Sequence, residues 1–250
     1  MPLRETEAIV LRTYRLGEAD KIVSLFTRQF GRLRAAAGGA QRTKSRYGGT
    51  LEPLSYIRLW LYERENRDLL RLNSAELLES FFDMQKDYRR QVAAQYLVEA
   101  SERLLPEREV NERAFRLIVA VLRALKRSPE IDRPLLYFNY WLLRLGGYLP
   151  DLERCFSCGR EIGEEAGYYG PGSEGAFCVA CQKTRPGASR RKISAQALAL
   201  ARVMRQSPLE RWLAEPSPPE TGEARQFFEE LVETHAEKKL VTRELLAEEA

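Results

Sequence analysis

The 250 residues, 44% hydrophobic and 30% charged, have the composition of a folded protein with one or two domains, which excludes the disordered and fibrous classes. No 18 apolar residues run together and no signal-peptide stretch opens the chain, so we expect a cytoplasmic protein without a membrane span. The formal net charge of +4 is unevenly distributed, with cations gathered in residues 21–51 and glutamates enriched after residue 210.

Five short runs in the first third of the chain have the pattern of β-strands. They are rich in apolar and β-branched residues, and turn residues at 17–20 separate the first two, which predicts a hairpin. Five short strands suit a small closed barrel, either an OB-fold or an SH3-like barrel. The five runs are 6–14, 21–27, 32–37, 53–62 and 69–73.

The stretch between Lys21 and Leu51 contains cations and no acid. Its glycine-rich part, residues 38–49, has no periodicity, so we expect a flexible surface loop. Nearby aromatic side chains, Tyr14, Phe30 and Tyr47, could stack on bases beside a groove that follows a phosphate backbone. This combination favours a nucleic-acid partner; a solvated basic face and a scaffold for an acidic protein remain the alternatives. The cations are Lys21, Arg28, Arg32, Arg34, Arg42, Lys44 and Arg46.

The same loop is a near miss to the phosphate-binding GxxxxGK[ST] sequence. Gly38 stands at the first glycine and Lys44-Ser45 at the end, but Thr43 occupies the second glycine position. A Cβ there obstructs the backbone amides that must approach a phosphate, and the residues from Tyr47 onward do not predict the required helix. The sequence therefore disfavours an ATPase.

Helical periodicity is expected to begin after Asn73, where Glu76 completes a capping box, and to continue to about Leu105. A second helix is expected from Asn111. One of its faces is apolar and predicts packing on a core. That face consists of Ala114, Phe115, Ile118, Val121, Leu122 and Leu125.

Three further helices are expected in the second half. The segment 135–145 is apolar nearly all round, so we place it at the centre of a helical body. Helices at 194–206 and 220–246 follow, with the proline-rich loop 215–219 before the second of them. The apolar stripe of the last helix is expected to pack against 135–145.

Four cysteines form two CxxC pairs with 19 residues, 159–177, between them. At this spacing two knuckles bring four thiolates to one tetrahedral ion, and Gly159 suits the tight turn that a knuckle needs. Because four thiolates close the coordination sphere, we predict one structural zinc ion per chain in a reducing compartment; a rubredoxin-like iron site and a thioredoxin-like pair are the alternatives. The predicted ligands are Cys155, Cys158, Cys178 and Cys181.

Catalytic residues are scarce. The chain has one histidine, His235, which excludes metal catalysis with several histidine ligands and disfavours Ser-His-Asp or Cys-His chemistry. No cluster of aspartates suggests a two-metal nuclease. We therefore expect a binding protein and not an enzyme.

Motifs over most of the chain resemble the RecO family of recombination mediators. In the N-terminal part they are Glu7-Ala8-Ile9-Val10-Leu11, Gly17-Glu18-Ala19-Asp20, Leu25-Phe26-Thr27, Gly38-Gly39-Ala40, Leu51-Glu52-Pro53 and Leu61-Tyr62. In the helical part they are Leu142-Leu143-Arg144-Leu145-Gly146-Gly147-Tyr148-Leu149-Pro150 and Cys155-Phe156-Ser157-Cys158-Gly159, and the second CxxC pair completes the pattern.

The resemblance implies an α+β multidomain protein. Its parts are an N-terminal five-stranded OB-fold barrel for nucleic acid (1–76), an α-helical domain in two pieces (77–149 and 189–250), and an inserted four-cysteine zinc finger (150–188). It also places the largely OB-fold DNA contacts of the family at Arg28, Arg34, Arg42, Lys44 and Arg46.

The resemblance further implies a role in DNA repair, the response to DNA damage and homologous recombination, in the cytoplasm and at the bacterial nucleoid. The expected activities are binding of single- and double-stranded DNA and annealing of complementary strands. Partners implied by the resemblance are RecR, with which recombinase is loaded onto single strands, and the acidic C-terminal tail of single-stranded-DNA-binding protein. The tail is expected to dock on the helical domain, where no motif identifies its contact residues.

Overall fold

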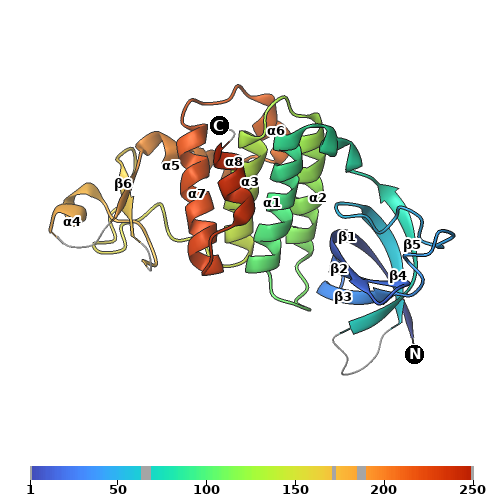
Figure 1. Cartoon of the computed structure of the whole chain (residues 1–250). Helices are drawn as coiled ribbons and strands as arrows, with labels where there is room; N and C mark the ends of the chain where they lie inside the picture. Colours follow the sequence, from blue (N-terminus) through green and yellow to red (C-terminus); the bar gives the residue numbers. More distant parts are fainter. Residues whose placement is uncertain (1, 63–68, 171–172, 185–189, 249–250) are drawn as a thin grey trace. The chain divides into compact units, whose positions relative to one another are not determined.

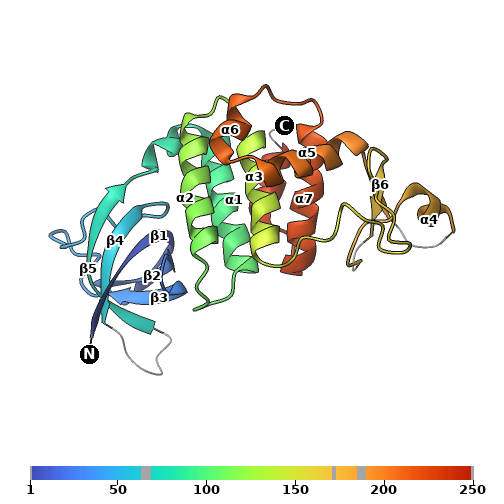
Figure 2. The same ribbon diagram turned by 180° about the vertical axis from the view of Figure 1, so that it is seen from behind.

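The computed structural model describes residues 2–62, 69–170, 173–184 and 190–248. The chain divides into two compact units: unit 1 is Met1–Arg127 with Glu244–Ala250, and unit 2 is Ser128–Arg243. Figures 1 and 2 show the order of their elements along the chain. Among the described residues, none of the helices combines the length and apolar character needed to cross a membrane.

A closed five-stranded barrel forms the first part of unit 1. Its strands are hydrogen-bonded in the order β1-β2-β3-β5-β4, and pairing of β1 with β4 closes the ring. All neighbours are antiparallel except β3 and β5, which are parallel. The five short runs predicted a small closed barrel, and the structure confirms the OB-fold that the family resemblance implied over the SH3-like alternative. The strands are β1 (Leu3–Leu16), β2 (Asp20–Thr27), β3 (Gly31–Ala37), β4 (Tyr56–Tyr62) and β5 (Leu69–Glu79).

Alternation along the strands builds the barrel core. In β3 and β4 every second side chain is buried, as the two-residue period of a strand requires. Val23, Leu25, Ile57 and Leu59 are among the residues that fill the interior. Tyr47, from the loop between β3 and β4, joins this core and is only 2% exposed. The barrel interior is therefore a packed core and not a channel.

The helix start expected after Asn73 is wrong. Residues 73–79 belong to β5, where Ser74 pairs with Trp60 and Glu79 with Tyr56. The capping signal is local, and the ladder with β4 outweighs it. A short 3-10 helix, η1 (Phe82–Lys86), follows, and α1 (Tyr88–Leu104) begins after Asp87, whose carboxylate accepts a hydrogen bond from the backbone N–H of Arg90.

The second helix of unit 1, α2 (Glu112–Arg127), confirms its prediction. The Oδ1 atom of Asn111 accepts a hydrogen bond of 2.9 Å from the backbone N–H of Ala114 and so caps the helix. The buried face contains all six residues predicted for it. Phe115 on this face contacts the barrel, with ring centroids 6.0 Å from Phe26 and 6.1 Å from Tyr56.

The start of β3 contacts the loop between α1 and α2. The backbone N–H of Arg108 donates to the carbonyl of Arg32 at 2.8 Å, and Arg32 Nε donates to the carbonyl of Leu105 at 2.9 Å. Gly31 lies at this contact with φ +67°, and a Cβ placed on it would be 2.2 Å from the carbonyl oxygen of Glu109. Only glycine fits here.

Replacing Gly31 with alanine is expected to lower the free energy of unfolding by about 2–4 kcal/mol, because a left-handed backbone and a backbone clash are both imposed. Urea denaturation would measure the loss. The matched control is Gly49→Ala, where φ is not positive and no atom lies within 4 Å of the new Cβ. Equal stability of the two variants would contradict the contact described here.

Unit 2 is built around α3 (Asp132–Leu145), as predicted for 135–145. It packs against α7 (Thr221–Ala236), α6 (Leu209–Ala214) and α5 (Ala195–Gln206), and the rings of Tyr140 and Phe228 lie 5.7 Å apart. The expected packing of the last apolar stripe on this helix is therefore confirmed.

The single helix predicted for 220–246 is wrong. It ends at Ala236, because Glu237 adopts a left-handed conformation with φ +52°, and α8 (Val241–Glu248) starts afresh. The sequence pattern also did not predict α6, which lies between α5 and the proline-rich loop.

Candidate metal centre and nucleic-acid surface

The first cysteine pair lies on a tight backbone turn. The N–H of Cys155 donates to the carbonyl of Arg160 at 2.7 Å, and the N–H of Gly159 donates back to the carbonyl of Cys155 at 2.8 Å. Gly159 has φ +72°, the left-handed conformation that glycine adopts without strain. The glycine after the pair thus allows the turn, as the sequence predicted.

The second pair lies at the start of α4 (Val179–Thr184), with Cys178 just before the helix and Cys181 inside it. Phe177 and Tyr168 exchange two backbone hydrogen bonds of 2.8 and 2.9 Å, which extend the small sheet of β6 (Gly167–Tyr169) and β7 (Arg191–Ile193). The N–H of Phe156 donates to the carbonyl of Ala176 at 2.8 Å. This bond joins the two pairs directly.

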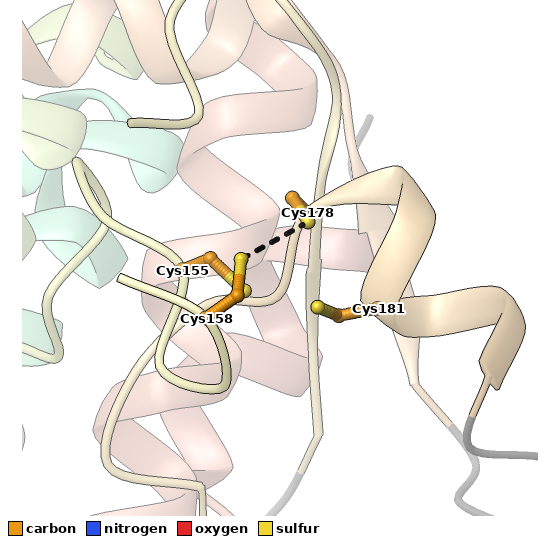
Figure 3. A group of neighbouring side chains, drawn as sticks. All are labelled: Cys155, Cys158, Cys178 and Cys181. Carbon is orange, nitrogen blue, oxygen red and sulfur yellow. Dashed lines mark hydrogen bonds between the residues drawn. The ribbon is translucent and has the colours of Figure 1, made fainter. Parts of the chain in front are cut away.

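The four sulfur atoms lie close together around one position. They all lie within 4.8 Å of one another, and the Sγ atoms of Cys158 and Cys178 are 3.9 Å apart. Figure 3 shows the side chains converging from the turn on one side and from the start of α4 on the other. Four thiolates about 2.3 Å from a tetrahedral zinc ion have sulfur–sulfur distances of about 3.8 Å. The four cysteines are therefore positioned to hold a metal ion.

The thiols alter one another's pKa values through the hydrogen bonds that they share. Burial raises the pKa of the Cys155 thiol, but backbone N–H groups of both pairs outweigh it and lower the pKa to about 6. Backbone hydrogen bonding from Cys181 lowers the pKa of Cys178. Hydrogen bonds to the sulfurs of Cys158 and Cys178 raise the pKa of Cys181 to about 12. A cation that replaces these shared protons binds all four groups as thiolates.

The cysteine cluster is only partly enclosed, since Cys158 is exposed and Cys181 is partly exposed. Cys155 and Cys178 are buried and pack with Phe177 and Tyr168 in one small cluster. The guanidinium of Arg190 lies 3.8 Å from the centre of the Phe177 ring and covers it. Because four protein sulfurs fill a tetrahedral sphere, no position remains for a reacting water. The geometry therefore suits structural support and not catalysis.

The basic loop of residues 38–49 is anchored to the barrel. Asp20 Oδ1 accepts a hydrogen bond of 2.8 Å from the N–H of Gly39, and the N–H of Gln41 donates to the carbonyl of Ala19 at 2.9 Å. Tyr47 fixes the other end, since its hydroxyl donates to the carbonyl of Leu72 at 3.0 Å. Residues 38–55 form turns with no helix, which removes the phosphate-binding arrangement of an ATPase.

Three predicted DNA contacts lie on this anchored loop. Arg42, Lys44 and Arg46 are all exposed. Within the described part of the chain, no ion pair engages any of them. Arg46 lies over the ring of Tyr47, 5.0 Å from its centroid, and donates to its hydroxyl at 3.0 Å. The three cations thus project from a backbone that the barrel holds in place.

The other two predicted contacts are opposed by carboxylates from distant parts of the sequence. Arg28 Nη2 lies 2.7 Å from Glu112 Oε1, and its Nη1 lies 3.3 Å from Glu7 Oε2. Hydrogen bonding to Glu112 accordingly raises the pKa of Arg28. Arg34 is more weakly opposed, with Nη2 4.0 Å from Glu107. Arg28 is therefore held within unit 1, whereas Arg34 can still turn toward a phosphate.

The aromatic side chains predicted to stack on bases do not form a platform. Tyr47 is buried in the barrel core, and Phe30 is partly buried against the same core. Only Tyr14, at 51% exposure, presents its ring to solvent. The prediction was wrong for Tyr47, which anchors the basic loop in the barrel core.

Unit 2 has a cavity of about 550 Å³ between the end of α3 and α5. Cations and apolar side chains both line it, together with Asp151 and Glu153. Arg205 Nη1 pairs with Glu153 at 2.6 Å, while Arg144 is exposed near the opening. The motif Leu142–Pro150 supplies part of its lining, although nothing in the sequence predicted a cavity. Its other basic and apolar lining residues include Arg202, Leu149, Leu198 and Ala201.

Two family models match the chain. The one described as "Recombination protein O N terminal" matches residues 1–81, and the one described as "Recombination protein O C terminal" matches residues 85–244. A protein of Koribacter versatilis named DNA repair protein RecO is 38% identical over 245 residues, which are 98% of each chain. A protein of the same name from Anaeromyxobacter sp. (strain K) is 33% identical over 96% of this chain and 94% of its own.

Proposed function

The chain belongs to the RecO family of DNA repair proteins, and on this basis we propose that it is a mediator that binds DNA without breaking or making bonds. It binds single- and double-stranded DNA, anneals complementary strands and, with RecR, helps to load recombinase onto single strands. Its place is the bacterial cytoplasm, at the nucleoid.

The observation that carries this proposal is the anchored loop with three unopposed cations. Arg42, Lys44 and Arg46 project from a backbone fixed by Asp20 and by buried Tyr47. Cations on a fixed backbone bind phosphates at a smaller entropic cost than cations on a flexible loop. This binding does not depend on the DNA sequence. Arg34 on β3 supplies a fourth contact when it leaves Glu107. Binding is then governed by phosphate charge and not by base stacking.

Annealing follows from the same chemistry. Complementary strands repel one another through their phosphates, and cations that neutralise one strand lower this barrier. The bases of a strand held by its backbone stay free to pair, since Tyr47 is buried in the barrel core and Phe30 is partly buried against it. An arrangement that holds backbones and frees bases suits a protein that must release a duplex.

We assign zinc to the four cysteines as a structural ion, one per chain. Four thiolates match its preferred donor set, and the small cluster around Phe177 offers little apolar core to replace the ion. Bound zinc would fix the segment between α3 and α5.

For the tail of single-stranded-DNA-binding protein we propose the cavity of unit 2. Acidic residues of a peptide would meet Arg144 and Arg202 at its walls, and a terminal aromatic ring would meet the apolar side chains of Leu198 and Ala201. The joint change Arg144→Ala and Arg202→Ala is expected to weaken binding of an acidic peptide with an aromatic end about 10-fold or more, because two charge-assisted hydrogen bonds are lost. Fluorescence anisotropy of the labelled peptide measures this.

The control variant, which we call the surface control, also replaces exposed cations of unit 2 with alanine. It combines Lys192→Ala, Arg211→Ala and Lys238→Ala. These three cations of unit 2 are exposed and do not line the cavity. The surface control should bind the peptide as the wild type does. If the Arg144 and Arg202 variant also binds like the wild type, the peptide docks elsewhere.

The proposed function is tested by annealing of two complementary labelled oligonucleotides, followed by energy transfer, in the presence and absence of ATP. We expect the protein to accelerate annealing, with no effect of ATP and no release of phosphate. An absence of acceleration together with tight binding of acidic proteins would support the scaffold alternative. Phosphate release coupled to annealing would identify an enzyme.

A further inference from the structure

The outer face of α2 carries a row of arginines that the basic-loop account does not use. The buried face of the helix packs in unit 1 through residues such as Phe115, Ile118 and Leu122. At about 100° per residue, the four arginines of the opposite face fall within an arc of about 80°, with Ala120 inside the same arc. We call Arg113, Arg116, Arg123 and Arg127 the α2 stripe.

The helix concentrates the positive charge of the chain. It contains the four stripe arginines and Lys126 against a single acid, Glu112, an excess of four cations that equals the formal net charge of +4 of all 250 residues. Glu112 itself is engaged by Arg28 at 2.7 Å. Nothing within the helix therefore offsets the stripe.

The four arginines of the α2 stripe differ in whether a carboxylate pairs with them. Arg123 pairs with Glu79 of β5 at 2.7 Å, and so helps to hold the helix against the barrel. Arg113, Arg116 and Arg127 are exposed, and over the described residues no hydrogen bond or ion pair engages them. Elsewhere in unit 1 many arginines are paired, for example Arg12 with Glu102 at 2.6 Å. Three unopposed guanidinium groups on one line are thus a distinct feature of this helix.

The stripe has the length and chemistry of a phosphate-binding row. From Arg113 to Arg127 the helix rises about 21 Å, which corresponds to about six phosphates along one strand of B-form DNA. Guanidinium groups bind phosphate oxygens through two parallel hydrogen bonds and stay charged at any physiological pH. A helix fixed at both ends presents them in a constant spacing.

The stripe and the basic loop lie at opposite ends of the β2–β3 hairpin. The loop joins this hairpin where Lys21 pairs with Ala37. The helix contacts the other end of the hairpin: Glu112 of α2 pairs with Arg28, and Phe115 of α2 contacts the ring of Phe26. β2 has eight residues, so the two ends are about 23 Å apart. Figures 1 and 2 both show α2 beside the barrel. One compact unit thus carries two separate basic surfaces.

We propose that the α2 stripe is a second phosphate-backbone site, which holds the incoming single strand while the basic loop holds the first. This inference rests on the proposed function, since it gives annealing the two strand sites that the reaction requires. Two sites on one unit hold both complementary strands on the same protein. Each strand then meets the other at a higher effective concentration than in free solution.

The stripe variant Arg113→Ala, Arg116→Ala and Arg127→Ala tests the proposal. All three side chains are exposed and unpaired, so we expect the thermal melting curve of the wild type. The surface control removes the same number of cations. Two readouts are needed: the affinity for one labelled strand, and capture of a second, non-complementary labelled strand by protein already saturated with the first.

We expect the stripe variant to bind the first strand within about 2-fold of wild type and to lose second-strand capture about 100-fold at about 0.1 M salt, as expected for the loss of three phosphate contacts. Its annealing rate should fall at least about 10-fold, and the surface control should behave as wild type. Wild-type capture and annealing by the stripe variant would overturn the second site.

Two further results would also overturn the second site, and they have different meanings. If the stripe variant loses first-strand affinity to the same degree, the stripe and the loop act as one site. If the wild type binds neither strand, the proposed function fails together with the stripe. The first-strand readout of the wild type separates these cases.

Discussion

Changing Arg42, Lys44 and Arg46 together to alanine is expected to weaken binding of a single strand about 100-fold at about 0.1 M salt. Each phosphate contact on a single strand contributes about 0.7 to the slope of log K against log salt, so the loss of three reduces the slope by about two. The barrel should stay folded, because Tyr47 and Asp20, which anchor the loop, are unchanged. Fluorescence anisotropy at four salt concentrations measures both quantities.

Two matched variants make this result specific. The surface control removes three exposed cations of unit 2 and should leave the slope within about 0.5 of the wild-type value if its cations contact no phosphate. Arg28→Ala should have a small effect, because this guanidinium is already engaged by Glu7 and Glu112. If the triple variant kept wild-type affinity and Arg28→Ala lost it, the DNA-binding surface would lie on the β2–β3 turn and not on the loop.

Changing Cys155 and Cys178 together to serine is expected to abolish metal binding. These are the two most deeply buried sulfurs, and the remaining pair cannot close a tetrahedral sphere. Apparent zinc-binding free energies in zinc-finger peptides are about 10 kcal/mol or more, and in this larger unit we expect a smaller but still dominant contribution to local folding. Amide hydrogens of residues 153–170 and 173–181 should therefore exchange much faster, while the barrel keeps its protection.

Elemental analysis of the same samples identifies the ion. The wild type should contain about one zinc per chain and the double variant none. Glu164→Ala is the control, since this exposed side chain lies between the two cysteine pairs in the sequence and supplies no sulfur. Iron in place of zinc would support the rubredoxin-like alternative. Unchanged exchange in the double variant would show that no metal supports this segment.

The barrel could be predicted because its strands follow local rules. The alternation in β3 and β4 is visible in the sequence, and turn residues separate β1 from β2. The end of β5 could not be predicted in this way. Asn73 and Glu76 form a local helix signal, whereas the pairing of Glu79 with Tyr56 depends on a strand far away in the sequence. Tertiary pairing decided this boundary.

The cysteine cluster could be predicted from the sequence, whereas the free positive charge on the barrel could be predicted only in part. Two CxxC pairs constrain their own geometry, because each pair sits on one turn. The charge of a surface cannot be predicted from a short stretch of sequence in this way. The stretch around Arg28 and Arg34 has no acid nearby in the sequence. The fold brings Glu7, Glu107 and Glu112 to these two arginines. A local count of cations therefore overestimates the free charge on the barrel.

On α2, by contrast, the free positive charge was underestimated. The apolar face of this helix predicts its packing, and the arginine spacing on the other face is equally visible in the sequence. Reading the polar face for charge, as well as the apolar face for packing, would have found it.

The most direct test of the account is a titration of fluorescent single-stranded DNA with the wild-type protein over a range of salt concentrations. Contacts from Arg34, Arg42, Lys44 and Arg46 to about four phosphates predict a slope of log K against log salt of about −3. A flat salt response, or no binding by protein that carries its metal, would contradict DNA binding through phosphate charge.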